Sequence, residues 1–208
     1  RRLIDGVSSW WCVAHGHNHP AIVEAIERQT RIMSHVMFGG FTHRPAAELA
    51  ERIAYIAPPQ MDCVFFADSG SISVEVAVKM AIQYQQAKGR ARRCKMVAVK
   101  GGYHGDTACA MALSDPDGMH TLFRGMMPEH FFAPQPADDS GTWAAALEET
   151  IDRAGDKVAG VICEPVFQAA NAMHFYSPDH LEAMRRICDS RDLVLVFDEI
   201  AAGFHRTG

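Results

Sequence analysis

The feature of this sequence that most restricts its fold is an alternation of short, continuous apolar runs with longer amphipathic segments. The apolar runs occupy residues 63–66, 96–99, 130–133, 158–162 and 193–197, and segments with apolar residues at helical spacing separate most of them. A strand that is apolar at every position must be buried on both of its faces. The pattern therefore predicts an α/β fold, with a mostly parallel sheet covered by helices on both faces.

Two further helices are predicted before this alternating region. They begin at Pro20 and Pro45, and proline suits the first turn of a helix because its missing N–H needs no partner there. The pattern changes near residues 40–45. We therefore expect an internal boundary between residues 42 and 43.

The charge and composition argue against several classes of partner. The 208 residues carry 20 Lys and Arg against 25 Asp and Glu, so the net charge of -5 offers no basic surface to nucleic acid or to an anionic membrane. No apolar run approaches the roughly 18 residues of a membrane span, and no signal peptide is recognisable. The six cysteines are scattered, without a C-x-x-C pair, and indicate reduced thiols. We expect a cytoplasmic protein.

Unusual residues collect directly after the predicted strands, in segments 68–71, 101–106, 163–165 and 198–200. In an open α/β sheet, ligands bind at the carboxyl ends of the strands. We therefore expect these four segments to form one site, and their convergence is more informative than any single motif.

Three of the segments suit one ligand. Ser69, Gly70 and Ser71 open a helix whose free N–H groups can hold a phosphate, although an ordinary N-cap is the simpler interpretation of this segment alone. Tyr103 can stack on a ligand from its glycine-rich turn, or it is a surface tyrosine. Asp198 ends an apolar strand, where a cap or an ion pair would explain it alone. Pyridoxal phosphate (PLP), a flat cationic ring that carries a phosphate, would bind to all three: its phosphate to the helix start, its ring to Tyr103 and its ring nitrogen to Asp198.

Other chemistries lack their motifs. No G-x-G-x-x-G turn follows a strand and no Walker loop is present, which disfavours dinucleotides and nucleoside triphosphates. No G-x-S-x-G elbow is present, which disfavours a serine hydrolase. His15, His17 and His19 resemble a metal cluster, but no fourth ligand accompanies them and a helix begins at Pro20, so we predict no metal site.

At these positions the chain resembles the class III aminotransferases, and the resemblance runs from end to end. The wider resemblance is carried by residues 5–6, 16, 19–20, 68–71, 102–106, 164–165 and 198–200. It implies the PLP-binding fold type I. Residues 1–42 would then be part of a small N-terminal domain and linker, and residues 43–208 the first part of a large PLP-binding domain.

Three further segments, residues 8–11, 34–40 and 119–123, resemble one branch of this family more specifically. In that branch, a homodimer with PLP transfers an amino group from S-adenosylmethionine to 7-keto-8-aminopelargonate and forms 7,8-diaminopelargonate for biotin biosynthesis. Two alternatives stay open: another class III enzyme that uses ω-amines or amino acids, and a non-catalytic α/β fragment.

The resemblance implies a cofactor-binding set distributed over the four segments: Ser69, Gly70, Ser71, Tyr103, His104, Glu164, Asp198 and Ile200. Within this set, Gly70 and Ser71 would contact the phosphate, Tyr103 and Ile200 would enclose the ring, and Asp198 would meet its nitrogen. Glu164 would orient these groups.

The resemblance also assigns residues to the substrate. Trp10, Trp11 and Tyr103 would line the substrate pocket, although adjacent tryptophans also serve in core or interface packing. Asp106 would orient neighbouring groups. Residues 37–40 would line the pocket of the neighbouring subunit.

The chain departs from the family pattern in several places. Residues 168–172 replace a glycine-rich stretch, so a loop that needs positive φ is expected to be altered. Ala202 and His205 replace a usual threonine and glycine. The lysine that holds the cofactor is expected beyond Gly208, and no lysine present lies in its motif, so we predict no turnover by these 208 residues alone.

Overall fold

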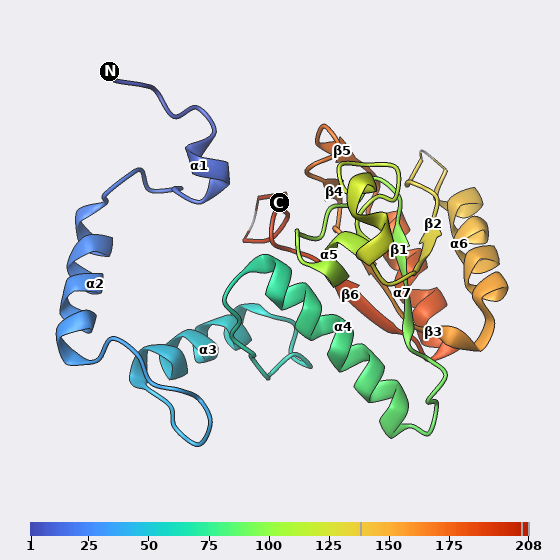
Figure 1. Ribbon diagram of the computed structural model, residues 1–208, viewed down its shortest axis with the longest axis horizontal. Coiled ribbons are helices and arrows are strands. Elements are labelled where there is room, and N and C mark those ends of the chain that lie inside the picture. The colour runs from blue at the N-terminus through green and yellow to red at the C-terminus, as the bar shows by residue number, and fades with distance from the viewer. Residues whose placement is uncertain (138, 205, 208) are drawn as a thin grey trace. The chain divides into compact units, whose positions relative to one another are not determined.

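A four-stranded parallel sheet forms the centre of the C-terminal part of the chain in the computed structural model, which describes residues 1–137, 139–204 and 206–207 (Figure 1). Across the sheet, the order of the strands is β2 (Phe131–Ala133), β1 (Lys95–Val99), β3 (Val158–Cys163) and β6 (Val194–Phe197). Each neighbouring pair is parallel. Four of the predicted apolar runs therefore form strands, and the predicted parallel sheet is confirmed.

The prediction of a strand at residues 63–66 was wrong. These residues have no regular secondary structure, and no strand in the described part of the chain pairs with them. Phe65 is 69% exposed. An apolar run becomes a strand only where a neighbouring strand supplies partners for its backbone N–H and C=O groups.

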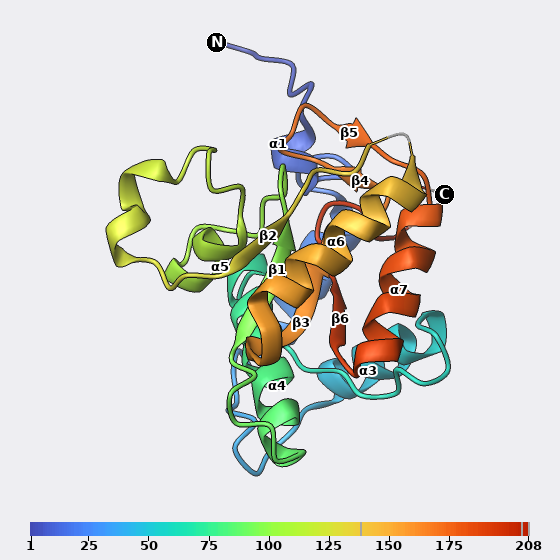
Figure 2. The ribbon, with the colours of Figure 1, turned by 90° about the vertical axis from the view of Figure 1, so that its right-hand side faces the viewer.

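Helices cover both faces of the sheet, because successive strand side chains point to opposite sides. The covering helices are α4 (Gly70–Ala87), α5 (Ala108–Leu113), α6 (Ser140–Ala154) and α7 (Asp179–Arg191). Val97 and Val99 pack in one cluster with side chains of α6 and α7, which lie side by side in Figure 2. Met96 and Ala98 pack in a second cluster with side chains of α4 and α5. The two predicted helical layers are confirmed.

Short elements complete this part of the chain: the 3-10 helices η1 (Thr121–Met126) and η2 (Gly155–Lys157), and an antiparallel hairpin of β4 (Phe167–Gln168) and β5 (His174–Phe175). The hairpin was not predicted. Its loop keeps left-handed backbone without glycine, since φ is 51° at Ala172 and 56° at Met173. The departure at residues 168–172 therefore leaves Ala172, and Met173 directly after it, in a conformation that disfavours a Cβ.

The first 65 residues form a separate unit, Arg1–Phe65, and the second unit is Phe66–Gly208. The helices of the first unit are α1 (Ser8–Trp11), α2 (Pro20–Ile32) and α3 (Arg44–Ile56), and the last two are the predicted ones. Only Ala46 is buried among the residues of this unit. The domain boundary between residues 42 and 43 stays a prediction. No helix in the described ranges has the length and apolar character to cross a membrane.

Replacing Ala172 by glycine tests the left-handed loop. Glycine removes the steric cost of a Cβ at positive φ, about 1 kcal/mol, but adds freedom to the unfolded chain. Ala170→Gly is the matched control, because Ala170 lies in the same loop without positive φ. We expect the free energy of unfolding, measured in urea, to be about 1 kcal/mol higher for Ala172→Gly than for Ala170→Gly. Equal values would contradict the left-handed assignment.

His130, directly before β2, links two neighbouring strands. The Met96 amide donates a hydrogen bond to its Nδ1 at 3.2 Å. Burial, and then the charge of Lys95, lowers the pKa of His130 to about 4. The unfolded chain binds this proton more readily, so the stability from the neutral ring is present above pH ~6.5 and is lost as the pH falls towards 4.

His130→Asn keeps an acceptor for the Met96 amide but cannot take up a proton. We expect the variant to lose less stability than the parent between pH 6.5 and 4, by on the order of 2 kcal/mol at the acid end. Urea unfolding at several pH values measures this difference, with His35→Asn, at an exposed histidine, as the control. Parallel pH curves for parent and His130→Asn would contradict the buried, neutral state.

Candidate active site

The candidate site is formed by the turns that follow β1, β3 and β6, together with the start of α4. The start of α4 and the turn after β6 lie against each other, since a Cβ added at Gly70 would lie 2.9 Å from Ile200 Cδ1. Ser69 is the N-cap of α4, and its Oγ accepts a hydrogen bond from the Ile72 amide at 3.3 Å. The turn expected at a phosphate therefore lies against the residue expected on the ring.

The turn after β1 approaches the same helix start very closely. Gly105 has a φ of 120°, and a Cβ there would lie 2.9 Å from Ser71 Cα. The Asp106 amide donates to Ser71 Oγ at 3.1 Å. This approach requires glycine at position 105, both for its backbone conformation and for the space.

Asp198 is a buried carboxylate at the end of β6. Its Oδ2 lies 2.7 Å from Nδ1 of His104, and the side chains of Asp198 and His104 are 4% and 0% exposed. Its Oδ1 accepts from the Ile200 amide at 3.2 Å. A buried carboxylate requires such partners to stay ionised. His104 thus lies behind Asp198, where it supports the carboxylate.

The tautomer of His104 follows from this pairing. An ionised Asp198 can only accept, so Nδ1 of His104 carries the proton. The Nε2 atom is buried and has no hydrogen-bond partner among the described residues. The His104 amide donates to Ser114 Oγ at 2.9 Å, which fixes the backbone beneath the ring.

Glu164, directly after β3, joins two of the turns. Its Oε2 accepts from the Tyr103 amide at 3.0 Å, and its Oε1 accepts from the Ala169 amide at 3.1 Å. The residue is 4% exposed, and burial raises the pKa of its carboxyl group. Glu164 therefore holds the backbone of the Tyr103 turn, and its role at the cofactor stays a prediction.

Tyr103 is held by its side chain as well. Its hydroxyl donates to Asp106 Oδ2 at 2.9 Å, and its ring stacks on His120 with centroids 5.9 Å apart. Burial, and then the Asp106 carboxylate, raises the pKa of Tyr103 to about 12. The phenol therefore keeps its proton at neutral pH.

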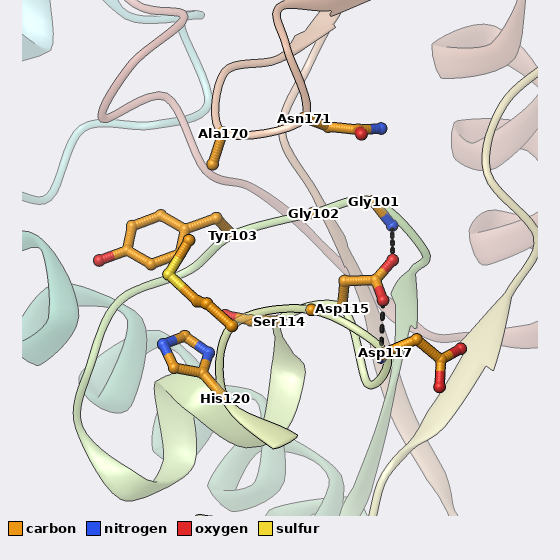
Figure 3. Close-up of a pocket in the computed structure, with 11 residues that line it drawn as sticks. Gly101, Gly102, Tyr103, Ser114, Asp115, Asp117, His120, Ala170 and Asn171 are labelled. Carbon is orange, nitrogen blue, oxygen red and sulfur yellow. Dashed lines mark hydrogen bonds between the residues drawn. The ribbon is translucent and has the colours of Figure 1, made fainter. Parts of the chain in front are cut away.

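A cavity of about 340 Å³ opens beside Tyr103 (Figure 3). Tyr103 and His120 lie on one side of the view, and Asp115 and Asp117 lie on the other. Asn171, from the loop of the hairpin, closes it from above in this view. The cavity thus lies between the turn after β1, residues 114–120 and the hairpin.

Trp10 and Trp11 belong to the first unit. They lie in α1, where every residue has positive φ, 55° at Trp10 and 67° at Trp11. Trp10 is 87% exposed. Their role at the substrate stays a prediction, as does the role of residues 37–40.

Sequence reasoning did not identify the position of His120 against Tyr103. His120 lies in the segment Met119–Phe123, which resembles one branch of the family, but nothing in the sequence indicated that its ring would contact Tyr103. At the departures near the C-terminus, Ala202 is buried at 4% exposure, and His205 lies outside the described residues.

These turns, their buried carboxylates and the sheet that positions them agree with one family of enzymes. The sequence profile described as Aminotransferase class-III matches residues 1–208. The chain belongs to the class III aminotransferases, and its parallel sheet between two helical layers is the fold type I architecture.

Within the family, the chain is similar to proteins named adenosylmethionine-8-amino-7-oxononanoate aminotransferase. It is 44% identical over 214 residues to the protein of Buchnera aphidicola subsp. Schizaphis graminum (strain Sg), covering 100% of this chain and 49% of that protein. It is 45% identical over 207 residues to the protein of Mycobacterium leprae (strain TN), covering 99% and 48%. The chain spans about half the length of these relatives.

Solved structures of transaminases share the fold of this chain. The crystal structure of the aminotransferase of that name from Methanocaldococcus jannaschii DSM 2661 matches with a TM-score of 0.91 and 32% identity, over 98% of this chain and 46% of that chain. An amine transaminase from an uncultivated Pseudomonas species, in its PLP-bound form, matches with a TM-score of 0.86 and 29% identity, over 99% and 49%.

Gly105→Ala tests the close approach of the turn after β1 to α4. The added Cβ meets Ser71 backbone, so either the turn or the helix start must move. Gly89→Ala is the matched control, because Gly89 also has positive φ, 77°, but has open space around it. We expect Gly105→Ala to lower the free energy of unfolding by about 2 kcal/mol more than Gly89→Ala does. Similar losses in urea unfolding would show that the turn yields without strain.

Proposed function

We propose that the full-length enzyme uses PLP to transfer an amino group from S-adenosylmethionine to 7-keto-8-aminopelargonate, giving 7,8-diaminopelargonate in biotin biosynthesis. The observation that carries the proposal is the contact of the α4 start with the turn that bears the buried Asp198. The choice of substrates is supported by the names of relatives at 41–45% identity.

The residues of this chain fit the cofactor. The backbone N–H groups of Gly70 and Ser71 lie in the first turn of α4, where a helix leaves its N–H groups without a partner of its own, and with the positive end of the helix they suit a phosphate. Tyr103 and Ile200 offer flat and apolar contacts to a ring, and Asp198 offers a carboxylate to a protonated ring nitrogen. When bound, PLP withdraws electrons from the carbon that carries the amino group.

The chain's own residues prepare that chemistry. His104 donates a hydrogen bond from its Nδ1–H to Asp198, which holds the carboxylate in one orientation at the end of β6. An ionised carboxylate in a buried site holds a proton on an opposing ring nitrogen more strongly than water would. Glu164 fixes the backbone of the Tyr103 turn, so the stacking ring is positioned before a ligand arrives.

Further parts of the proposal concern the assembly and domain organisation of the whole enzyme. We expect a homodimer in which residues 37–40 line the neighbouring subunit's pocket, and in which Trp10 and Trp11 contact the substrate. We expect the cofactor-binding lysine C-terminal to Gly208, residues 1–42 in a small domain, and residues 43–208 in the large domain. We expect a cytoplasmic location.

A different class III activity is the second candidate. Structures of ω-transaminases and amine transaminases match this chain with TM-scores of 0.84 to 0.86 and 26–29% identity. One of these proteins is named an amine transaminase, and the other two are named ω-transaminases. Only substrates distinguish this candidate, because the cofactor site would be the same.

The direct test supplies the full-length enzyme and PLP with S-adenosylmethionine and 7-keto-8-aminopelargonate and follows 7,8-diaminopelargonate by mass spectrometry. We expect product, and a loss of at least about a hundredfold in rate for Asp198→Asn, because the ring nitrogen loses its anionic partner. Asp189→Asn, at an exposed carboxylate on α7, is the matched control and should be unchanged. Transfer from ω-amines with none from S-adenosylmethionine would favour the second candidate.

A further inference from the structure

Three side chains beside the cavity form a closed arrangement. The Tyr103 hydroxyl is 2.9 Å from Asp106 Oδ2, and His120 Nε2 is 2.9 Å from Asp106 Oδ1. The rings of Tyr103 and His120 stack at an interplanar angle of 26°. Each residue therefore contacts both of the others.

The direction of these hydrogen bonds fixes what Tyr103 offers to a ligand. An ionised Asp106 only accepts, so both Tyr103 and His120 donate to it. The single phenolic proton is thereby committed to Asp106. The free lone pairs of the Tyr103 oxygen can accept a hydrogen bond from an amine or ammonium group.

His120 is the anchored member of the group. Its side chain is 6% exposed, whereas that of Asp106 is 71% exposed. Its backbone is the N-cap of η1, and its carbonyl accepts from the Phe123 amide at 2.9 Å. An exposed carboxylate alone keeps rotational freedom, so the buried histidine restricts where Asp106 can point.

We propose that His120 is a positioning residue, which acts through Asp106 to orient the Tyr103 hydroxyl as a hydrogen-bond acceptor for the amino donor. The inference rests on the proposed function, because it assigns Tyr103 to the site of an aminotransferase. The hydrogen bond from His120, and then that from Tyr103, lowers the pKa of Asp106, so this carboxylate stays ionised at neutral pH.

The test compares His120→Phe in the parent and in the Tyr103→Phe background of the full-length enzyme with PLP. Phenylalanine keeps a stacked ring but cannot donate to Asp106. We expect kcat/KM for the amino donor to fall about fivefold in the parent and to stay unchanged in the Tyr103→Phe background, where no hydroxyl is left to orient. His120→Gln, which restores an N–H donor, should recover most of the loss.

Equal losses in both backgrounds, or none in the parent, would overturn the proposal. His180→Phe is the matched control, because His180 is also buried, meets the Trp143 ring edge to face and donates one hydrogen bond from its Nδ1 to the Ser177 carbonyl. It should lower stability without a loss in kcat/KM that depends on Tyr103.

A second measurement separates this inference from the proposed function. Urea unfolding of the single variants His120→Phe and Tyr103→Phe and of the double variant requires no substrate. We expect non-additive losses, since both changes remove donors to one carboxylate. Additive losses would overturn the coupling. If S-adenosylmethionine gives no product, the proposed function fails, and the kinetic comparison is made with whichever amine the parent accepts.

Discussion

An aspartate at the end of an apolar strand loses water on folding, and it stays ionised only if the protein supplies donors in return. For Asp198 these are Nδ1 of His104 and the Ile200 amide. The Asp198 amide in turn donates to the Cys163 carbonyl at 2.8 Å, which ties the turn after β6 to the end of β3. The carboxylate is therefore fixed by three neighbouring segments before any ligand is present, and the rest of the site is arranged around it.

Buried hydrogen bonds and close contacts also fix the other turns of the site. Glu164 is buried and divides its two oxygens between the Tyr103 turn and the hairpin that begins at Phe167. Gly105 removes the side chain that would separate the Tyr103 turn from Ser71. Irregular segments are normally the mobile parts of a domain, but these are held by buried acceptors and by contact with a helix. Such support gives loops the precision that a binding site needs.

The parallel sheet, its two helical layers and the meeting of turns at its carboxyl edge could be predicted from sequence. They follow from local patterns: continuous apolar runs, helical spacing and residues placed directly after strands. Pairings between distant side chains could not. His104 and Asp198 are 94 residues apart, and no local pattern selects the histidine as the partner. The strand prediction at residues 63–66 failed for the same reason, since a strand forms only beside a neighbouring strand, and the sequence of the segment does not specify that neighbour.

Tyr103 shows how these constraints combine. Its amide is held by Glu164, its hydroxyl by Asp106, and its ring lies against His120. The three contacts come from the end of β3, from its own turn and from the start of η1. A ring fixed at both ends has little rotamer freedom left to lose when a flat ligand stacks on it, so more of the contact energy remains for binding. The buried polar groups around Tyr103 thus favour one geometry of the site, and the strands behind them keep that geometry in place.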